Sequence, residues 1–545
     1  MRRIYLTFYI VLLALILSNC ARRGRPEGGP KDVKPPIMVS ADPPFKTVHF
    51  DAKKIKIDFD EYIKLHKVGE ELIISPPLKY KPIITPLGTA SKEIRMELLD
   101  TLKKETTYIF NFGTSVRDNN EGNILYNFKY VFSTGSYIDS LKLKGTIKDA
   151  ISNKVAKNVA ILLYRMDSTY NDSIIYKGLP NYIANTLDTT VWEITNIKEG
   201  KYLLAALKQK NYDYKFKPKI NKIAFYPKPI NIPVDTTLKF SLSLFKEILD
   251  YKLTRPSEMS KQHIVFGYEG IAKNLKVKLL SKVPDNFKSI TAFERDKDTL
   301  NYWFNTPDLD SLRFKVTNPL KDSVYIDTVT VKLRAKKFDS LIIGSKKRGA
   351  LKLKEDFKML SNQPITKIDE SKIQIMDKDS VSIPFKTEIS KNKTEFVFKF
   401  DKTPSNSYKI TILPKSITTF FEHSKDTIRY RLITKKPTDY GNIFLTLTHV
   451  KSYPLIVQLT DTNAKVIEER NIKNKQEVNF TNLKPGKFLI RVIYDKNKNG
   501  VWDTGNFLKH KMPEQVLYFY KVLEVRANWD VAEIFDLSRS KIPKK

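Results

Sequence analysis

The sequence contains a single cysteine, Cys20, among its 545 residues. One cysteine cannot form a disulfide within the chain or build a cysteine metal cluster. Glycine is also scarce, at 19 residues, and neither a phosphate loop nor a dinucleotide fingerprint occurs. The six histidines show no paired metal spacing, and no Gly-x-Ser-x-Gly motif is found. The sequence therefore predicts a protein that is not an enzyme and that requires no cofactor.

Long apolar runs are missing as well, apart from a short one near the start. Residues 11–17 are all apolar and follow Arg2 and Arg3. This run is too short to anchor a spanning helix and is typical of a signal-peptide core. The residues after it, Leu-Ser-Asn-Cys at 17–20, resemble a bacterial lipobox. The resemblance implies cleavage before Cys20 and acylation of its thiol and its new amino group, which would attach the protein to a membrane.

The segment after Cys20 is rich in arginine, glycine and proline. Residues 20–34 show no apolar periodicity, so we expect a flexible tether after a signal peptide of residues 1–19. Ala21 is not the aspartate that retains many lipoproteins at the inner membrane, so the resemblance implies the outer membrane. The tether lacks the acidic cluster of some surface-exported lipoproteins, and both the periplasmic face and the cell surface stay open.

Acidic residues are outnumbered, with 60 Asp and Glu against 95 Lys and Arg. One interpretation is binding to a polyanion, either nucleic acid or the phosphates of a membrane leaflet. The other is a set of solvated lysines that alternate on strand faces. The basic residues are spread along the whole chain and form no nucleic-acid motif, so we expect no nucleic-acid partner.

Apolar residues alternate with polar ones in many short runs. Residues 55–59, 396–400 and 444–448 each place apolar side chains on one face of a strand. Runs of this kind, separated by turns rich in Pro, Asn, Asp and Lys, predict an all-β chain of tandem antiparallel β-sandwiches. The length is enough for four or five domains.

Residues 35–137 carry an ordered set of strand and turn signals. They open with Pro35–Pro44, include the turn Asp118–Asn123 and close with Phe128–Gly135. This set resembles the bacterial Ig-like domain first described in S-layer proteins. Residues 350–436 resemble it more weakly, because Tyr408 and the alternation after it match the strand that begins near Tyr108.

A second repeat joins Thr195–Leu204 to Thr481–Ile490, which share a Thr-Asn-x-Lys-x-Gly-Lys pattern. Both copies resemble the turn and strand of carboxypeptidase-regulatory, transthyretin-like β-sandwiches. The resemblance implies two such modules, at 138–245 and 437–545. The intervening residues 246–349 indicate a further β-sandwich without a family resemblance.

The repeat also predicts backbone geometry. Gly200 and Gly486 each precede the strand of their copy, so we expect both to show a positive φ or a very close approach of other atoms.

One loop has the residue types of a calcium site. Oxygen ligands stand at loop positions one, three, five, seven and nine, with Gly500 at position six, where a calcium loop turns sharply. The predicted calcium ligands are Asp495, Asn497, Asn499, Val501 (through its carbonyl) and Asp503. The alternative is an Asx-rich turn without metal.

A short pattern of Asp, then Ser or Thr, then an apolar residue or Thr recurs along the chain. It is similar to the O-glycosylation sequon of exported proteins in the Bacteroides and Flavobacterium group. The structural alternative is that these pairs begin turns. The acceptors implied by the resemblance are Ser140, Ser173, Thr189, Thr236, Thr299, Ser311, Ser323, Thr328, Ser340, Ser380 and Thr427.

These features favour a lipid-anchored outer-membrane protein, similar to those of Bacteroidota. Its role would be that of a non-catalytic scaffold or accessory subunit that binds other envelope proteins. Its partners would be the membrane and envelope proteins, for example those of an assembly or transport complex. Two alternatives remain open: a surface adhesin or glycan-binding lipoprotein, and a hydrolase with an unrecognised site.

Anchoring can be tested by replacing Cys20. The Cys20→Ser variant has no thiol for acylation, so it should leave the membrane fraction or stay uncleaved. Fractionation and mass measurement of the amino terminus would show either effect. Unchanged membrane association together with unchanged processing would contradict the predicted anchor.

Overall fold

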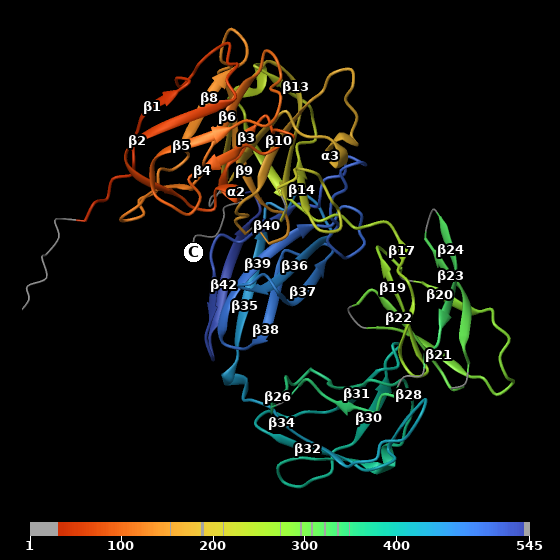
Figure 1. Ribbon diagram of the computed structural model, residues 1–545. Helices are drawn as coiled ribbons and strands as arrows, with labels where there is room; N and C mark the ends of the chain where they lie inside the picture. The colour runs from red at the N-terminus through yellow and green to blue at the C-terminus, as the bar shows by residue number, and fades with distance from the viewer. Residues whose placement is uncertain are drawn as a thin grey trace, which may run out of the picture. The chain divides into compact units, whose positions relative to one another are not determined.

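The computed structural model describes residues 31–152, 154–186, 190–210, 212–272, 274–294, 297–306, 309–320, 323–334, 337–347 and 349–538. Cys20 and the predicted signal peptide lie outside the described residues, as does Thr189. Strands dominate, helices are short, and the predicted fold class of tandem β-sandwiches is confirmed (Figure 1). Within the described part, no helix is long and apolar enough to cross a membrane.

The chain forms two compact units. The first holds the described residues up to Lys142 together with 181–184 and 194–198, and the second holds the remainder. The first unit contains the Ig-like sandwich, whose sheets run β1-β2-β5-β4, with β7 beside β2, and β3-β6-β8. Its elements are β1 Met38–Asp42, β2 Lys54–Leu65, α2 Val68–Glu71, β3 Ile73–Ser75, β4 Ile83–Thr85, β5 Ser91–Glu97, β6 Thr107–Asn111, β7 Val116–Asp118 and β8 Lys129–Ser133.

This strand order is that of a constant-type Ig sandwich, in which four strands face three. The period-two alternation of β2 buries Ile55, Ile57 and Phe59 against the second sheet, which contributes Phe110 and Phe132. The predicted turn after β7 is closed by the Asp118 carboxylate, which accepts three backbone N–H groups from residues 121–123. These bonds outweigh burial and hold the pKa of Asp118 below its ordinary value.

Residues 246–349 also form a four-against-three sandwich. The sheets run β17-β19-β22-β21, with β18 beside β19, and β20-β23-β24, so the order matches the first sandwich strand for strand. Sequence patterns had indicated no family here. Its strands are β17 Lys252–Leu253, β18 Ser257–Ser260, β19 His263–Glu269, β20 Lys276–Leu279, β21 Ser289–Phe293, β22 Thr299–Phe304, β23 Ser311–Pro319 and β24 Val324–Lys332.

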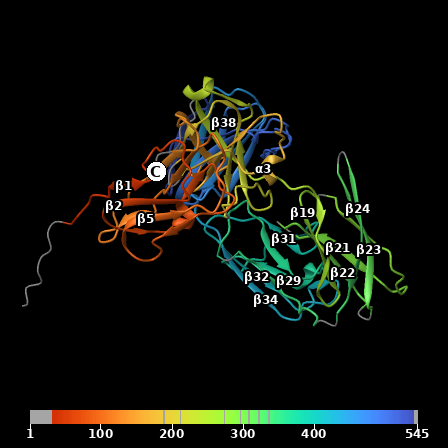
Figure 2. The same ribbon diagram turned by 45° about the horizontal axis from the view of Figure 1, so that its top comes forward.

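Residues 343–433 repeat this order with additions. The sheets run β25-β27-β31-β30, β26-β34-β32-β29 and β28-β33, and Figure 2 shows β29, β32 and β34 side by side. The elements are β25 Ile343–Gly344, β26 Gly349–Ala350, β27 Phe357–Ser361, β28 Ile365–Ile368, η2 Glu370–Lys372, β29 Ile373–Met376, β30 Phe385–Ile389, β31 Glu395–Phe400, β32 Ser407–Ile412, β33 Ile417–Thr419 and β34 Ile428–Ile433.

The first and last of these sandwiches share a tyrosine corner. The backbone N–H of Lys103 donates to the Tyr108 hydroxyl at 2.8 Å, and that of Thr403 donates to the Tyr408 hydroxyl at 2.7 Å. Both tyrosines stand at the start of the sixth strand of the Ig order and are almost fully buried. A corner of this kind is a hallmark of Ig-like sandwiches.

The two modules that share the second repeat have one strand order in common. In the first, the sheets run β12-β9-β16 and β11-β10-β13-β14, with β15 also on β13; in the second, β38-β35-β42 and β37-β36-β39-β40, with β41 also on β39. In each, the first and last strands pair in parallel.

The first module contains β9 Leu141–Asp149, β10 Ala160–Arg165, α3 Ile174–Lys177, β11 Tyr182–Asn185, β12 Val191–Ile197, β13 Gly200–Lys208, β14 Lys222–Phe225, β15 Ile230–Ile232, η1 Val234–Thr237 and β16 Lys239–Leu244. The second contains η3 Pro437–Asp439, β35 Gly441–Thr448, β36 Leu455–Asp461, β37 Val466–Ile472, β38 Glu477–Leu483, β39 Gly486–Tyr494, β40 Val516–Tyr518, β41 Leu523–Val525 and β42 Asp530–Asp536.

The glycine expectation holds for one copy and is wrong for the other. Gly200 has φ 149°, in the region that favours glycine, whereas Gly486 has no positive φ and a Cβ there would meet nothing closer than 3.7 Å. The residue that turns left-handed in both copies is the asparagine four positions earlier, with φ 58° at Asn196 and 56° at Asn482. Asparagine tolerates this conformation because its short amide can bond locally.

This difference predicts unequal effects of alanine. Gly200→Ala should destabilise its module by about 1–3 kcal/mol, because its φ suits glycine although there is room for a methyl group. Gly486→Ala should change stability by less than about 0.5 kcal/mol. Hydrogen exchange of peptides from β13 and β39 in the full chain measures both. Equal protection losses would contradict the assigned geometry.

Candidate functional site

From Phe488 onward, strand β39 is apolar on both faces except for one charged side chain, Arg491. Ile490 and Val492 face the core of their own sandwich, while Ile493 belongs to a second apolar cluster on the outer side. Arg491 lies on that outer side and is only 5% exposed. A buried guanidinium is costly unless its donors are paired, so its partners identify what covers this face.

Those partners come from both repeat modules. The Arg491 Nε donates to Gln458 Oε1 at 2.5 Å, and its Nη1 donates to the Tyr518 hydroxyl at 3.1 Å and to the Ile151 carbonyl at 2.7 Å. The Tyr518 hydroxyl also donates to the Ile151 carbonyl. Burial raises the pKa of Tyr518, so this phenol stays a donor. Ile151 belongs to the first repeat module, so a single carbonyl accepts two donors of the second.

The turn that presents this carbonyl is organised by Asp149, at the end of β9. Its Oδ1 accepts the backbone N–H groups of Ile151 at 3.2 Å and Ser152 at 2.9 Å, and Lys222 pairs with its other oxygen. Burial pushes the pKa of Asp149 upward, but the Lys222 ammonium and the Ser152 bonds outweigh it and hold the pKa below its ordinary value. All of these contacts lie within the first module, so they hold the turn without help from the last module.

A loop between β39 and β40 makes a second contact with the first module. The Phe507 ring is fully buried and stands edge-on to Phe225 at a centroid distance of 5.3 Å. The Phe507 backbone N–H donates to the Glu247 carboxylate, and Thr504 Oγ1 donates to the Lys246 carbonyl at 2.7 Å. Lys246 and Glu247 directly follow the first module. We call the contacts of Arg491, Tyr518 and this loop with the first module and with these two residues the module clasp.

The clasp leaves almost no free space at Gly505. A Cβ there would lie 2.6 Å from the Phe245 ring and 2.7 Å from the Lys511 carbonyl, so the tight packing requires glycine. Next to it, a ring nitrogen of His510 lies 3.0 Å from Asp172 of the first module. Burial raises the pKa of Glu247, although the Phe507 N–H opposes this.

The predicted calcium loop forms the first half of the same loop. Asp495 is 5% exposed, and its carboxylate accepts the N–H groups of Asn499 at 3.1 Å and Gly500 at 2.8 Å. Gly500 has φ 77°, as its place at the sharp turn requires. Asp503 accepts the side-chain amides of Asn497 and Asn499. The five predicted ligands are therefore near one another, but the side-chain oxygens of the four Asp and Asn ligands already accept hydrogen bonds inside the loop.

The fit to calcium is partial. The amide nitrogens of Asn497 and Asn499 face Asp503, so both amides would have to turn for their oxygens to reach a shared cation. The Glu514 carboxylate also lies here, although it is not among the predicted calcium ligands. It accepts the N–H of Lys496 at 2.7 Å and of Asp503 at 3.1 Å. Among the described residues, no three His, Cys, Asp or Glu side chains are grouped to hold one metal ion.

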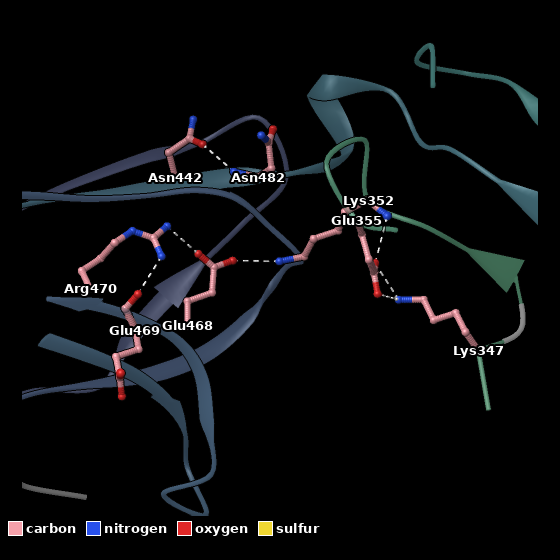
Figure 3. A network of polar contacts seen from close by, with 8 residues as sticks. All are labelled: Lys347, Lys352, Glu355, Asn442, Glu468, Glu469, Arg470 and Asn482. Carbon is pink, nitrogen blue, oxygen red and sulfur yellow. Dashed lines mark hydrogen bonds and ion pairs between the residues drawn. The ribbon is translucent and has the colours of Figure 1, made fainter. Parts of the chain in front are cut away.

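A polar network links residues 347–355 to the last module (Figure 3). Glu468 accepts Lys352 Nζ at 2.8 Å and Arg470 Nη2 at 3.0 Å, and it is only 16% exposed. Glu355 accepts Lys347 Nζ at 2.6 Å and the Lys352 backbone N–H at 3.1 Å. The chain from the third Ig-like sandwich is thus tied to β37 of the last module.

The predicted glycosylation acceptors that the structure describes all lie at the surface. None of them is buried, and Thr236, Thr299 and Thr427 are half-buried. Thr236 Oγ1 donates to the Pro233 carbonyl at 2.7 Å, which shows the turn role that the structural alternative expects. Both interpretations of the Asp-Ser and Asp-Thr pairs therefore stay open.

The clasp residues were not predicted from the sequence, although one signal was present. The position of Arg491 corresponds to Ala205 in the first repeat copy, five residues after the shared glycine. A charge inside a strand whose neighbours are apolar on both faces indicates a buried, paired cation and hence a covering partner. Phe507 offered no comparable signal, because a lone aromatic in a polar loop is common.

One comparison with known protein families bears on the first sandwich. Residues 32–134 match the family model of the bacterial Ig-like domain. The predicted Ig-like domain at the start of the chain is therefore confirmed. No curated protein matches the chain.

Several solved structures align with the chain at low similarity. The S-layer protein SbsC is 12% identical over 86% of this chain and 67% of its own, with a TM-score of 0.15. The Bacillus anthracis TIE protein is 10% identical over 94% and 76%, at 0.14, and the BSP domain of a biofilm associated protein is 9% identical over 84% and 94%, at 0.15. Scores this low carry no argument about function.

Calcium binding by the Asp495 loop can be measured on the full chain. With two charged ligands and neighbouring lysines, we expect a dissociation constant of about 10⁻⁴–10⁻³ M. Binding would stabilise the last module by at most about 1–2 kcal/mol at millimolar calcium. Calorimetric titration and melting in calcium or chelator should show this, and Asp503→Asn, which keeps the shape, should weaken it. Identical melting in calcium and chelator would leave an ordinary Asx turn.

Proposed function

We propose that this chain is a lipid-anchored, non-catalytic scaffold of the bacterial outer membrane that presents β-sandwich surfaces to other envelope proteins. The bacterial Ig-like match at 32–134 and the tandem sandwiches support the coarser statement of a surface or scaffold protein. The anchor at Cys20 and the outer-membrane location belong to the proposal and rest on the sequence resemblance.

The module clasp is the observation that carries the proposal. It uses a buried arginine, a buried phenylalanine and two buried carboxylates, Asp149 and Glu247, to hold the first repeat module against the last. Groups of this kind serve catalysis when they line a cleft, but here each is satisfied by a protein partner. The buried polar groups of the clasp thus hold one module in a fixed position relative to another, as a scaffold requires.

The last module also offers a surface for a partner. Strand β42 lies at the edge of the sheet β38-β35-β42, and its Ile534 is 64% exposed. Trp529, just before β42, is 58% exposed. An edge strand can accept a further strand from another protein, which gives affinity through backbone hydrogen bonds.

The proposal can be tested by opening the clasp. Phe507→Ala should destabilise the clasp by about 3–5 kcal/mol, because it removes a fully buried ring. Envelope proteins that co-purify with the wild-type chain, extracted in mild detergent through a tag after Lys545, should then be lost or reduced. Leu508→Ala is the matched control, because that neighbouring side chain is 54% exposed.

The outcomes separate the alternatives. Loss of the same partners in both variants, or in neither, would contradict a role for the fixed module pair. Recovery of glycans in place of envelope proteins would favour the adhesin. Turnover of a substrate by the purified chain would overturn the non-catalytic proposal.

A further inference from the structure

The sheet β20-β23-β24 has one buried and one exposed face. On β23, Leu312, Phe314 and Val316 are fully buried in the sandwich core. The alternate residues point to the other side, where the side chains are exposed or half-buried. That exposed face carries five cations, which we call the basic face: Lys276, Lys278, Arg313, Lys315 and Lys332.

The strand register places these cations close together. Lys278 stands directly opposite Lys315, which stands opposite Thr328 on β24. In the adjoining rows, Lys276 is opposite Thr317, and Arg313 is opposite Thr330. Like charges directly opposite each other on a sheet are destabilising. The Lys278–Lys315 pair therefore carries a repulsion that a bound anion would relieve.

No acidic side chain within these three strands balances the basic face. All residues of the strands are described, and Asp327 is the one acidic residue among them. Asp327 alternates onto the opposite side, where burial together with its charge raises the pKa of Tyr251 to about 12. The net charge of the exposed face is therefore strongly positive.

An apolar surface adjoins the basic face at one end. Val324 and Ile326, at the start of β24, are 61% and 57% exposed and alternate onto the same face as the cations. Ile326 lies in the row of Lys276 and Thr317. One exposed sheet face thus changes along its length from apolar to cationic.

The spacing of these rows matches the depth profile of a lipid surface. At about 3.3 Å per residue, Val324 lies about 7 Å from the row of Ile326 and about 13 Å from the row of Lys278 and Lys315. Interfacial apolar groups enter about 5–10 Å into the boundary between headgroups and acyl chains. With Val324 and Ile326 at that depth, Lys278 and Lys315 stand at the level of the headgroup phosphates, and Lys276, in the row of Ile326, reaches that level by extending its long side chain.

We propose that the basic face, with Val324 and Ile326, docks on a membrane surface that carries anionic phosphate headgroups. This goes beyond the proposed scaffold function, because it gives residues 246–349 their own membrane contact. Stable membrane attachment commonly combines a lipid chain with a polybasic patch. A soluble polyanion offers the charges without the apolar layer, so the contribution of Val324 and Ile326 distinguishes the two.

The test uses the chain from Ala21 onward, which has no acylated cysteine. The protein should be made in a host that does not glycosylate Asp-Ser and Asp-Thr pairs, because a sugar on Thr328 would cover the basic face. Flotation with vesicles of phosphatidylcholine plus one third phosphatidylglycerol should show binding, and pure phosphatidylcholine vesicles should show little. Lys278→Gln with Lys315→Gln should weaken binding about 30-fold at low salt.

Two further variants decide whether the face is specific. Lys409→Gln with Arg431→Gln removes the same charge from the equivalent sheet of the next sandwich, where these residues also stand opposite each other, and should change binding less than threefold. Val324→Ser with Ile326→Ser should weaken vesicle binding at high salt, when charge is screened. Equal losses for both charge pairs would overturn the proposal. So would unchanged vesicle binding by the serine variant.

Discussion

The structure of the second unit depends on the burial of Arg491. A guanidinium on the outer face of a strand is costly to remove from water unless its donors find acceptors. Gln458 and Tyr518 of its own module each accept one of its N–H groups, and the Ile151 carbonyl, 340 residues earlier in the chain, accepts a third. The buried arginine of the last module therefore depends on the first repeat module for one of its three hydrogen bonds.

The same dependence explains how the intervening chain is arranged. The first repeat module and the last are in contact, so residues 248–436 leave this pair and return to it. The return is fixed by the Lys352–Glu468 ion pair close to where the last module begins. Exposed ion pairs contribute little to folding stability, and this pair is only partly buried. Its main effect is therefore to orient the returning chain against the last module.

Much of the fold could be predicted because it is local. Period-two alternation located strands such as β2 and β35, and turn chemistry correctly assigned Asp118 and Gly500. The Gly486 expectation failed because Asn482 is the left-handed residue before β39 and the glycine there has ordinary backbone, whereas in the first copy both Asn196 and Gly200 have a positive φ. The clasp could not be predicted, since it joins residues hundreds of positions apart and shows no periodicity. The calcium ligands of the Asp495 loop stay a prediction, because the direction of each amide and carboxylate depends on side-chain rotation that sequence spacing does not determine.

The clasp has a mechanical consequence. A pull applied between the first repeat module and strand β42 is transmitted directly through the Arg491 and Phe507 contacts. Residues 248–436 lie outside that path, because the chain leaves the clasp after Glu247 and returns only at the last module. As long as the clasp holds, these two Ig-like sandwiches bear no tension, and they lengthen the molecule only after it opens.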